Sequence, residues 1–230
     1  MLRLSMMDDS VRPSHDQGSN VRAAYDTVAR EYDAQFASEL DAKPLDRALL
    51  TAFVELVGAG VIADVGCGPG HVTRFLASGG ADVLGVDLSP AMIDIARARA
   101  PELAFTVGSM LELPVTDGAW AAAVVLYSII HLDDDERGRA FHELARAVRP
   151  NGRMLVSFHV DTAEVRAGEV AHVTEFLGRP VTLDGYFLDP GEVEGALADA
   201  GFRTTAKLIR APIPDIEYPS RRCYLLAQRT

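Results

Sequence analysis

The chain has 230 residues and a formal net charge of −11, and this length favours one α/β domain, with or without a small lid. The acidic balance argues against a nucleic-acid partner, because phosphate-backbone binding needs clustered lysine and arginine. No apolar run approaches the roughly 20 residues of a membrane span, and no signal-peptide pattern opens the chain. The cysteines Cys67 and Cys223 are expected to be reduced thiols. These features favour a cytoplasmic protein with a small-molecule partner, and they say nothing about oligomeric state.

The first part of the chain is predicted to be helical. Residues 1–19 are polar and are expected to form a mobile N-terminal arm. Apolar residues spaced three and four apart predict a helix over 21–37. A second helix is predicted from Asp41, as its N-cap, to about Val57, with Pro44 in its first turn. The segment 20–57 is therefore expected to be a helical lid on a single domain, 20–230.

Strands and helices then alternate. Strand-like segments are predicted at 61–65, 83–87, 103–107, 121–127 and 154–159, with helices at 71–78, 90–100, 133–148 and 192–200. This alternation predicts a mainly parallel sheet with helices on both faces. The last two strands, about 203–211 and 221–228, are joined by a link too short for a parallel crossover, so they are expected to form an antiparallel hairpin at one edge. Residues 161–188 interrupt the alternation and are predicted to be an insertion on the acceptor side of the site.

A glycine-rich turn follows the first strand, with Asp64 before Gly66, Gly68 and Gly70. Glycine lets the backbone bend sharply and lets a ligand approach the main chain, while N–H groups at the next helix start point toward that ligand. The spacing departs from the dinucleotide fingerprint G-x-G-x-x-G, and a nearby carboxylate suits an ammonium group better than a pyrophosphate. Asp87 stands where an acid holds ribose hydroxyls. The pattern favours a nucleoside with a cationic, phosphate-free tail, such as S-adenosylmethionine.

These motifs resemble those of the class I S-adenosylmethionine-dependent methyltransferases. Segments 64–70 and 85–92 are similar to the family's first two motifs, and segments 108–110 and 149–153 to those after the third and before the fifth strand. The resemblance covers about residues 21–228 and is nearest to bacterial small-molecule methyltransferases of the natural-product type. It implies a Rossmann-like sheet of seven strands in the order 3-2-1-4-5-7-6, mainly parallel with one antiparallel edge strand and helices on both faces.

Carried over residue by residue, the resemblance implies a site for S-adenosylmethionine, with S-adenosylhomocysteine as the product. Gly66 and Gly68 would contact the methionine end and Asp87 the ribose. An N-terminal helix laid over the cofactor would bring Tyr32 to the methionine carboxylate. The family usually has aspartate where Ser109 stands, although serine can still accept a hydrogen bond from adenine. The implied cofactor-binding residues are Tyr32, Asp64, Gly66, Cys67, Gly68, Asp87, Leu88, Met92, Ser109, Met110 and Leu126.

The acceptor is expected above the C-terminal ends of the strands. His131 follows the fourth strand and is a candidate general base or positioning donor, with a structural histidine as the alternative. Tyr25 shares a helix face with Tyr32 and is a second catalytic candidate, with core packing as the alternative. No metal site is predicted. The candidate acceptor-pocket residues, for which plain packing stays open, are Tyr127, His159, Phe176, Tyr186 and Arg222.

The sequence thus predicts an enzyme that transfers a methyl group from S-adenosylmethionine to carbon, nitrogen or oxygen of a small acceptor. The aromatic residues of the insertion suit an aromatic or heteroaromatic natural-product intermediate. Two alternatives stay open: a nicotinamide-dependent oxidoreductase, because of the glycine turn, and a non-catalytic S-adenosylmethionine-binding protein, because of Ser109. A nucleic-acid methyltransferase is not expected, because segment 126–129 lacks the Asn/Asp-Pro-Pro-aromatic pattern that grips a flipped base.

Overall fold

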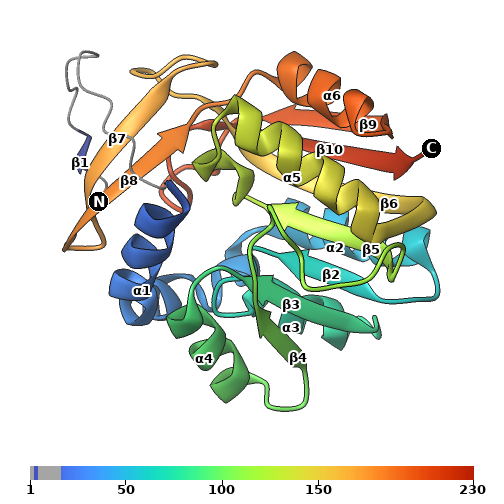
Figure 1. Cartoon of the computed structure of the whole chain (residues 1–230). Helices are drawn as coiled ribbons and strands as arrows, with labels where there is room; N and C mark the ends of the chain where they lie inside the picture. The colour runs from blue at the N-terminus through green and yellow to red at the C-terminus, as the bar shows by residue number, and fades with distance from the viewer. Residues whose placement is uncertain (1–2, 5–16) are drawn as a thin grey trace.

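The computed structural model describes residues 3–4 and 17–230 (Figure 1). Its larger sheet has seven strands in the order β4-β3-β2-β5-β6-β10-β9. They are β2 (Ile62–Val65), β3 (Val83–Asp87), β4 (Ala104–Val107), β5 (Trp120–Leu126), β6 (Val148–Asp161), β9 (Phe202–Arg210) and β10 (Arg221–Arg229). β10 pairs antiparallel with both β6 and β9, and the remaining pairs are parallel. The predicted fold class and the order 3-2-1-4-5-7-6 are confirmed.

Helices cover both faces of this sheet, and successive strand residues face opposite cores. The helices are α1 (Gln17–Phe36), α2 (Pro44–Val57), α3 (His71–Ser78), α4 (Pro90–Arg99), α5 (Asp134–Ala147) and α6 (Pro190–Asp199), with 3-10 helices η1 (Glu39–Ala42) and η2 (Ile129–His131). Ile62 belongs to the core cluster that includes residues of α2 and α3, whereas the next residue, Ala63, belongs to the cluster that includes residues of α5 and α6. In Figure 1, α5 accordingly lies in front of the sheet and α2 and α3 behind it. Because successive side chains of a strand point to opposite faces of the sheet, neighbouring residues contribute to different cores.

The central strands are buried on both faces, as a parallel strand between helix layers must be. All four residues of β2 are buried, and so are the first six of β5. Their small side chains, such as Ala63 paired with Ala123, let the helices approach closely. The turns at the C-terminal ends of these strands are therefore held on a rigid base.

The prediction that Asp41 caps α2 is wrong. Asp41 lies inside η1, and Lys43 occupies the N-cap position of α2 without a side-chain cap bond. The guanidinium of Arg47 donates to the carbonyl oxygens of Leu40 and Asp41. An extra turn of 3-10 helix, closed by these bonds, thus precedes α2.

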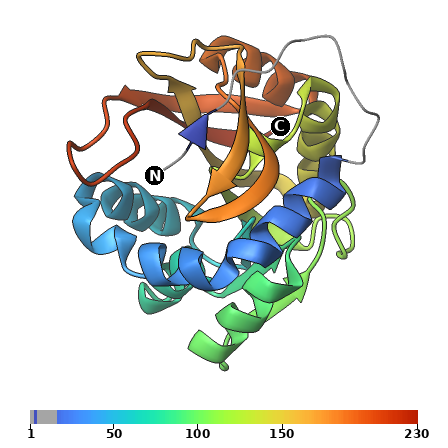
Figure 2. The same ribbon diagram turned by 90° about the vertical axis from the view of Figure 1, so that its left-hand side faces the viewer.

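The insertion at 161–188 contains a β-hairpin that the sequence did not predict. Its strands, β7 (Val170–Phe176) and β8 (Arg179–Tyr186), form a second sheet with β1 (Arg3–Leu4) in the order β1-β7-β8. Ala24 of α1 is buried with Val173 and Leu183 of the hairpin. Figure 2 shows the hairpin and α1 side by side at one end of the large sheet. Together they cover the edge where the glycine turn lies.

The predicted N-terminal arm at 1–19 falls mostly outside the described residues. Within the described part, Gln17 to Ser19 belong to α1. No described helix is long and apolar enough to span a bilayer.

Candidate active site

The glycine turn needs glycine for two separate reasons. Gly66, Gly68 and Gly70 all have left-handed backbones, with φ of 78°, 52° and 78°, which side-chain-bearing residues rarely adopt. A Cβ on Gly66 would also lie 2.4 Å from the Cβ of Ser128, whereas a Cβ on Gly68 would meet only a Tyr32 ring carbon, at 3.8 Å. The Gly68 backbone thus faces open space.

Asp87, at the end of β3, holds this turn in place. Its Oδ2 accepts a hydrogen bond from the backbone N–H of Gly68 at 2.8 Å, and its Oδ1 accepts one from Ser89 N–H at 2.8 Å. Burial raises the pKa of Asp87, although these two N–H donors counteract it. A carboxylate has about four lone-pair positions, so both oxygens can still accept hydrogen bonds from a ligand.

Asp64 is a buried carboxyl at the end of β2, 2% exposed. Its Oδ2 accepts a 2.6 Å hydrogen bond from Thr73 Oγ1. Burial raises the pKa of Asp64 to about 6, against the opposing effects of the Thr73 bond and of His71. A cationic group bound beside it would favour the ionised form.

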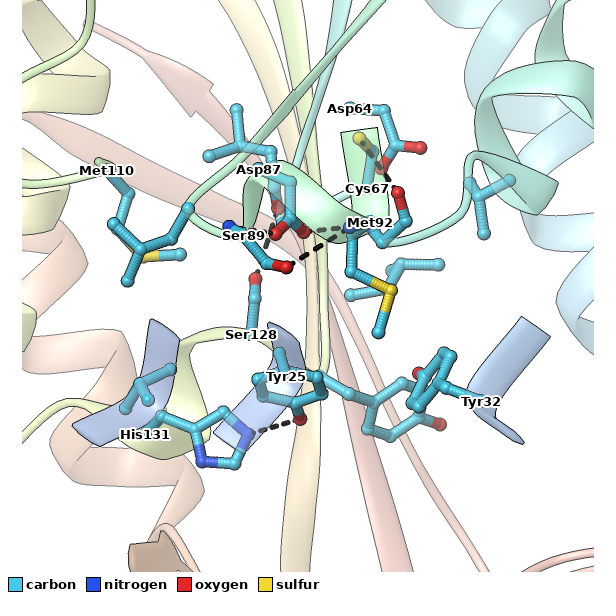
Figure 3. A pocket seen from close by; sticks show the side chains of 18 of the residues that line it. Tyr25, Tyr32, Asp64, Cys67, Asp87, Ser89, Met92, Met110, Ser128 and His131 are labelled. Atoms are coloured by element: carbon cyan, nitrogen blue, oxygen red, sulfur yellow. Dashed lines mark hydrogen bonds between the residues drawn. The ribbon is translucent and has the colours of Figure 1, made fainter. Parts of the chain in front are cut away.

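Tyr25 and His131 meet across the pocket mouth (Figure 3). The Tyr25 hydroxyl lies 2.7 Å from His131 Nε2, and His131 Nδ1 lies 2.8 Å from the carbonyl oxygen of Asp184. A carbonyl only accepts, so Nδ1 carries a proton, and in the neutral ring Nε2 accepts from Tyr25. Burial lowers the pKa of His131 and raises that of Tyr25, which the charge of Asp87 raises further. The resting pair is therefore a neutral phenol donating to a neutral imidazole.

An aromatic cluster lies around this pair. The ring centroids of Tyr25, Tyr32 and Phe176 are 5.9 to 6.4 Å apart, with edge-to-face geometry, an arrangement favoured by ring quadrupoles. Burial raises the pKa of Tyr32, with contributions from Tyr25, Glu39 and Asp87. Tyr32 is consequently a hydrogen-bond donor at neutral pH.

Helix α1 is fixed over the site by an acid that sequence reasoning missed. Asp26 Oδ1 accepts hydrogen bonds from Ser89 Oγ at 2.5 Å and from Ala91 N–H at 3.2 Å. Both donors lie at the start of α4, whose N-terminus also favours a negative charge. Nothing near Asp26 in sequence indicates this partner, since it comes from another element.

One cavity unites most of the predicted site residues. It is lined by Tyr25, Tyr32, Asp64, Gly66, Cys67, Gly68, Asp87, Leu88, Met92, Ser109, Met110, Leu126, Tyr127 and His131. It also includes Glu39, Lys43, Asp46 and His71, none of which the sequence reasoning singled out. All four lie at or next to the start of a helix, where polar and charged residues are common. The sequence alone therefore does not mark them as site residues.

The other four predicted residues, His159, Phe176, Tyr186 and Arg222, are not among those that line this cavity. His159 Nδ1 shares a 2.6 Å hydrogen bond with Ser220 Oγ, and burial together with the charge of Arg222 lowers its pKa to about 3. Phe176 belongs to the aromatic cluster, and Tyr186 packs against the large core.

Arg222 belongs to a buried ionic network instead. It is 2% exposed, its Nη1 lies 3.1 Å from Glu217 Oε2, and it donates to two backbone carbonyls. Arg210 bonds the same Glu217 carboxylate at 2.6 Å and reaches Asp46 at 2.8 Å. Tyr224 donates to Asp46 and shares a 2.9 Å hydrogen bond with Tyr127. The network thus anchors one wall of the cavity.

A candidate metal site is not found among residues 3–4 and 17–230, where no three His, Cys, Asp or Glu side chains form a suitable group.

Comparisons with known proteins agree with this geometry. Residues 62–152 match the family model described as a methyltransferase domain. The demethylmenaquinone methyltransferase of Beutenbergia cavernae is 30% identical over 141 residues, 60% of this chain and 57% of that protein. The chain spans about half the length of the curated relatives it matches.

Solved structures share the fold at low identity. The 1,6-didemethyltoxoflavin-N1-methyltransferase of Burkholderia thailandensis, solved with its substrate and S-adenosylhomocysteine, has a TM-score of 0.75 at 19% identity, covering 99% of this chain and 95% of that one. The [4+2]-cyclase SpnF has a TM-score of 0.70 at 17% identity, covering 94% and 97%.

The sheet order and the glycine turn are those of the class I S-adenosylmethionine-dependent methyltransferase fold, and residues 62–152 match a methyltransferase domain. Among the proteins compared, those named for a methylation reaction act on small molecules.

Proposed function

We propose that this protein transfers a methyl group from S-adenosylmethionine to a small-molecule acceptor. The observation that carries the proposal is the position of Asp87, whose two oxygens accept from the backbone N–H groups of Gly68 and Ser89. Asp87 lines a cavity that also includes Tyr25 and His131. The cofactor fits the residues present: Gly68 leaves its backbone open, Asp87 can accept from ribose hydroxyls, and Leu88 and Met92 offer apolar sides for adenine.

S-adenosylmethionine, when bound, supplies an activated methyl group on a sulfonium centre, and its transfer leaves S-adenosylhomocysteine. Because the methyl donor is already activated, the protein contributes mainly alignment and exclusion of water. Helix α1 and the β7–β8 hairpin cover the site, and the π faces of the tyrosine rings of α1 favour a nearby cation.

We propose that Tyr25 and His131 together take up the proton that an oxygen or nitrogen acceptor loses. The acceptor would donate to the Tyr25 oxygen while the Tyr25 proton moves to His131 Nε2, 2.7 Å away. The Asp184 carbonyl, bonded to Nδ1, keeps Nε2 as the accepting nitrogen and stabilises the imidazolium that forms. Tyr25 thus needs no free phenolate, which its raised pKa disfavours.

The acceptor would lie between this pair and the Tyr127 side of the cavity. Tyr127 lines the cavity, but its hydroxyl is held by Tyr224 at 2.9 Å, so its ring is the part available to a ligand. Planar aromatic or heteroaromatic acceptors suit such a ring, and they are the class that we propose.

The experiment that tests this function is a screen of low-mass acceptors with methyl-labelled S-adenosylmethionine, followed by mass spectrometry to locate the label. Label on a planar acceptor, absent with boiled protein, supports the proposal. Binding of S-adenosylmethionine with no transfer to any acceptor favours the second candidate below.

The second candidate is S-adenosylmethionine binding without methyl transfer. It is favoured by one observation: Ser109 stands where the family usually has an acid, and its hydroxyl already accepts a 3.1 Å bond from Leu111 N–H. The fold is also compatible with other chemistry, since a [4+2]-cyclase shares it. The nicotinamide-dependent alternative has no comparable support, because the matched domain is a methyltransferase domain.

A further inference from the structure

The two ring nitrogens of His71, the first residue of α3, have different surroundings. Its side chain is 9% exposed, and Nε2 lies 2.9 Å from Glu39 Oε1. The other nitrogen, Nδ1, is buried and has no hydrogen-bond partner in the part of the chain that the structure describes. A buried polar atom without a partner is destabilising, so native proteins rarely leave one unless a ligand or water meets it.

The hydrogen bond to Glu39 determines which ring nitrogen of His71 has no partner among the described residues. A carboxylate only accepts, so His71 Nε2 carries the proton and donates, and in the neutral ring Nδ1 presents a lone pair. Burial alone would raise the pKa of Glu39, but the His71 hydrogen bond and the charge of Lys43 outweigh it and lower this pKa to about 2. Glu39 is therefore ionised at neutral pH and holds His71 in this tautomer.

The surroundings of His71 indicate which ligand group Nδ1 would meet. His71 lines the same cavity as Gly68, Tyr32 and Asp64. His71 follows Gly70 directly and therefore lies where the glycine turn begins α3. This is the region of the cavity that would hold the amino-acid part of the methyl donor.

We propose that His71 Nδ1 accepts a hydrogen bond from the α-ammonium group of the bound S-adenosyl amino acid, with Glu39 as the positioning residue. Tyr32, a phenol donor, would serve the carboxylate, and Asp64 would share the ammonium charge. The inference deepens the proposed function and rests on it.

Two variants isolate this nitrogen. Asn at position 71 can place an oxygen acceptor where Nδ1 lies, whereas Phe keeps a ring of similar shape without an acceptor; both lose the bond to Glu39. His71→Phe is expected to weaken S-adenosylhomocysteine binding about tenfold or more, the effect of losing a hydrogen bond to a charged group. His71→Asn is expected to stay within about threefold of wild type.

The ligands provide a second comparison, measured by calorimetry on the full chain. Methylthioadenosine lacks the amino-acid part, and the desamino analogue of S-adenosylhomocysteine lacks only the ammonium group. Both should bind His71→Phe as they bind wild type, within about twofold. Retention of methylthioadenosine binding also shows that the variant is folded.

Three results would overturn the inference. His71→Phe could bind S-adenosylhomocysteine as tightly as wild type, or could lose the desamino analogue to the same degree, or His71→Asn could be as weak as His71→Phe. In each case wild type still binds S-adenosylhomocysteine and the proposed function stands. If wild type binds neither S-adenosylmethionine nor S-adenosylhomocysteine, both the function and this inference are wrong.

Discussion

The Tyr25 hydroxyl of α1 and the His131 ring of η2 lie 2.7 Å apart, although 106 residues separate them in sequence. Asp184, from the β7–β8 hairpin, completes this contact through its backbone carbonyl. Three separate elements therefore meet at one imidazole ring, whose Nε2 is the proton-accepting nitrogen.

If this nitrogen takes the acceptor proton, His131→Ala should lower kcat by about 10²-fold or more, the usual contribution of a general base. S-adenosylhomocysteine affinity should change less than about threefold, because His131 does not hold the cofactor. Tyr25→Phe keeps the aromatic packing and should lower kcat by about tenfold or more. Steady-state kinetics with the identified acceptor and calorimetry separate the two effects; an equal loss of cofactor affinity would make His131 structural.

The pH dependence of kcat tests the same assignment. The base form of His131 is the neutral ring, and burial lowers its pKa. Activity should therefore persist below the ordinary histidine range and then fall as the ring becomes protonated. The acid limb of the kcat profile should disappear in the residual activity of His131→Ala. An acid limb that is the same in both proteins would assign it to another group.

The raised pKa of Asp64 predicts that the affinity for the cofactor also depends on pH. Its pKa is raised to about 6, and only the ionised form attracts an ammonium group. S-adenosylhomocysteine affinity should thus weaken as pH falls through about 6 and level off above it. In Asp64→Asn the affinity should be lower and should depend less on pH between 5 and 8. Calorimetric titrations at several pH values would measure this, and an unchanged slope in the variant would contradict it.

The two glycines Gly66 and Gly58 provide a matched test of the turn. Both have positive φ, 78° and 68°, but a Cβ on Gly66 would lie 2.4 Å from Ser128, whereas one on Gly58 would meet nothing within 4 Å. Gly58→Ala should lower the free energy of unfolding by about 1 kcal/mol, the backbone effect alone. Gly66→Ala should add about 1–3 kcal/mol of overpacking. Urea denaturation measures both, and equal losses would contradict the steric argument.

Neighbouring arginines test the buried ionic network. Arg222 is buried against Glu217, whereas Arg221 pairs with Asp161 at the surface, its side chain 55% exposed. Arg222→Met should lower the free energy of unfolding by about 3–5 kcal/mol, because it leaves a buried carboxylate with one partner fewer. Arg221→Met should lower it by less than about 1 kcal/mol. A raised acceptor KM in Arg222→Met without the expected loss of free energy of unfolding would instead indicate that Arg222 contacts the acceptor.

The sheet order and the cofactor edge could be predicted from sequence because their determinants are local. Gly66, Gly68 and Gly70 mark the turn, and Asp87 ends the next strand. Ser89 followed by Pro90 marks the start of α4. The short link before β10 fixed the antiparallel pairing, since it leaves no room for a parallel crossover.

The acceptor side was harder to predict, because its contacts are long-range. Nothing in the sequence marks the carbonyl of Asp184 as the partner of His131, since every residue has a carbonyl. The β7–β8 hairpin did leave a usable pattern: alternating apolar residues flank Gly178, whose φ is 76°, as in a hairpin turn. Arg222 was predicted to line the acceptor pocket because of its charge alone. Only the packing of Glu217 and Arg210 shows where that charge is neutralised.

The central claim is that this cavity binds S-adenosylmethionine. Calorimetric titration of the full chain with S-adenosylhomocysteine tests it most directly, with NAD as the comparison ligand. We expect a single site with a dissociation constant in the micromolar range and no heat from NAD. Absence of binding by both S-adenosylmethionine and S-adenosylhomocysteine, or tighter binding of NAD, would contradict the account.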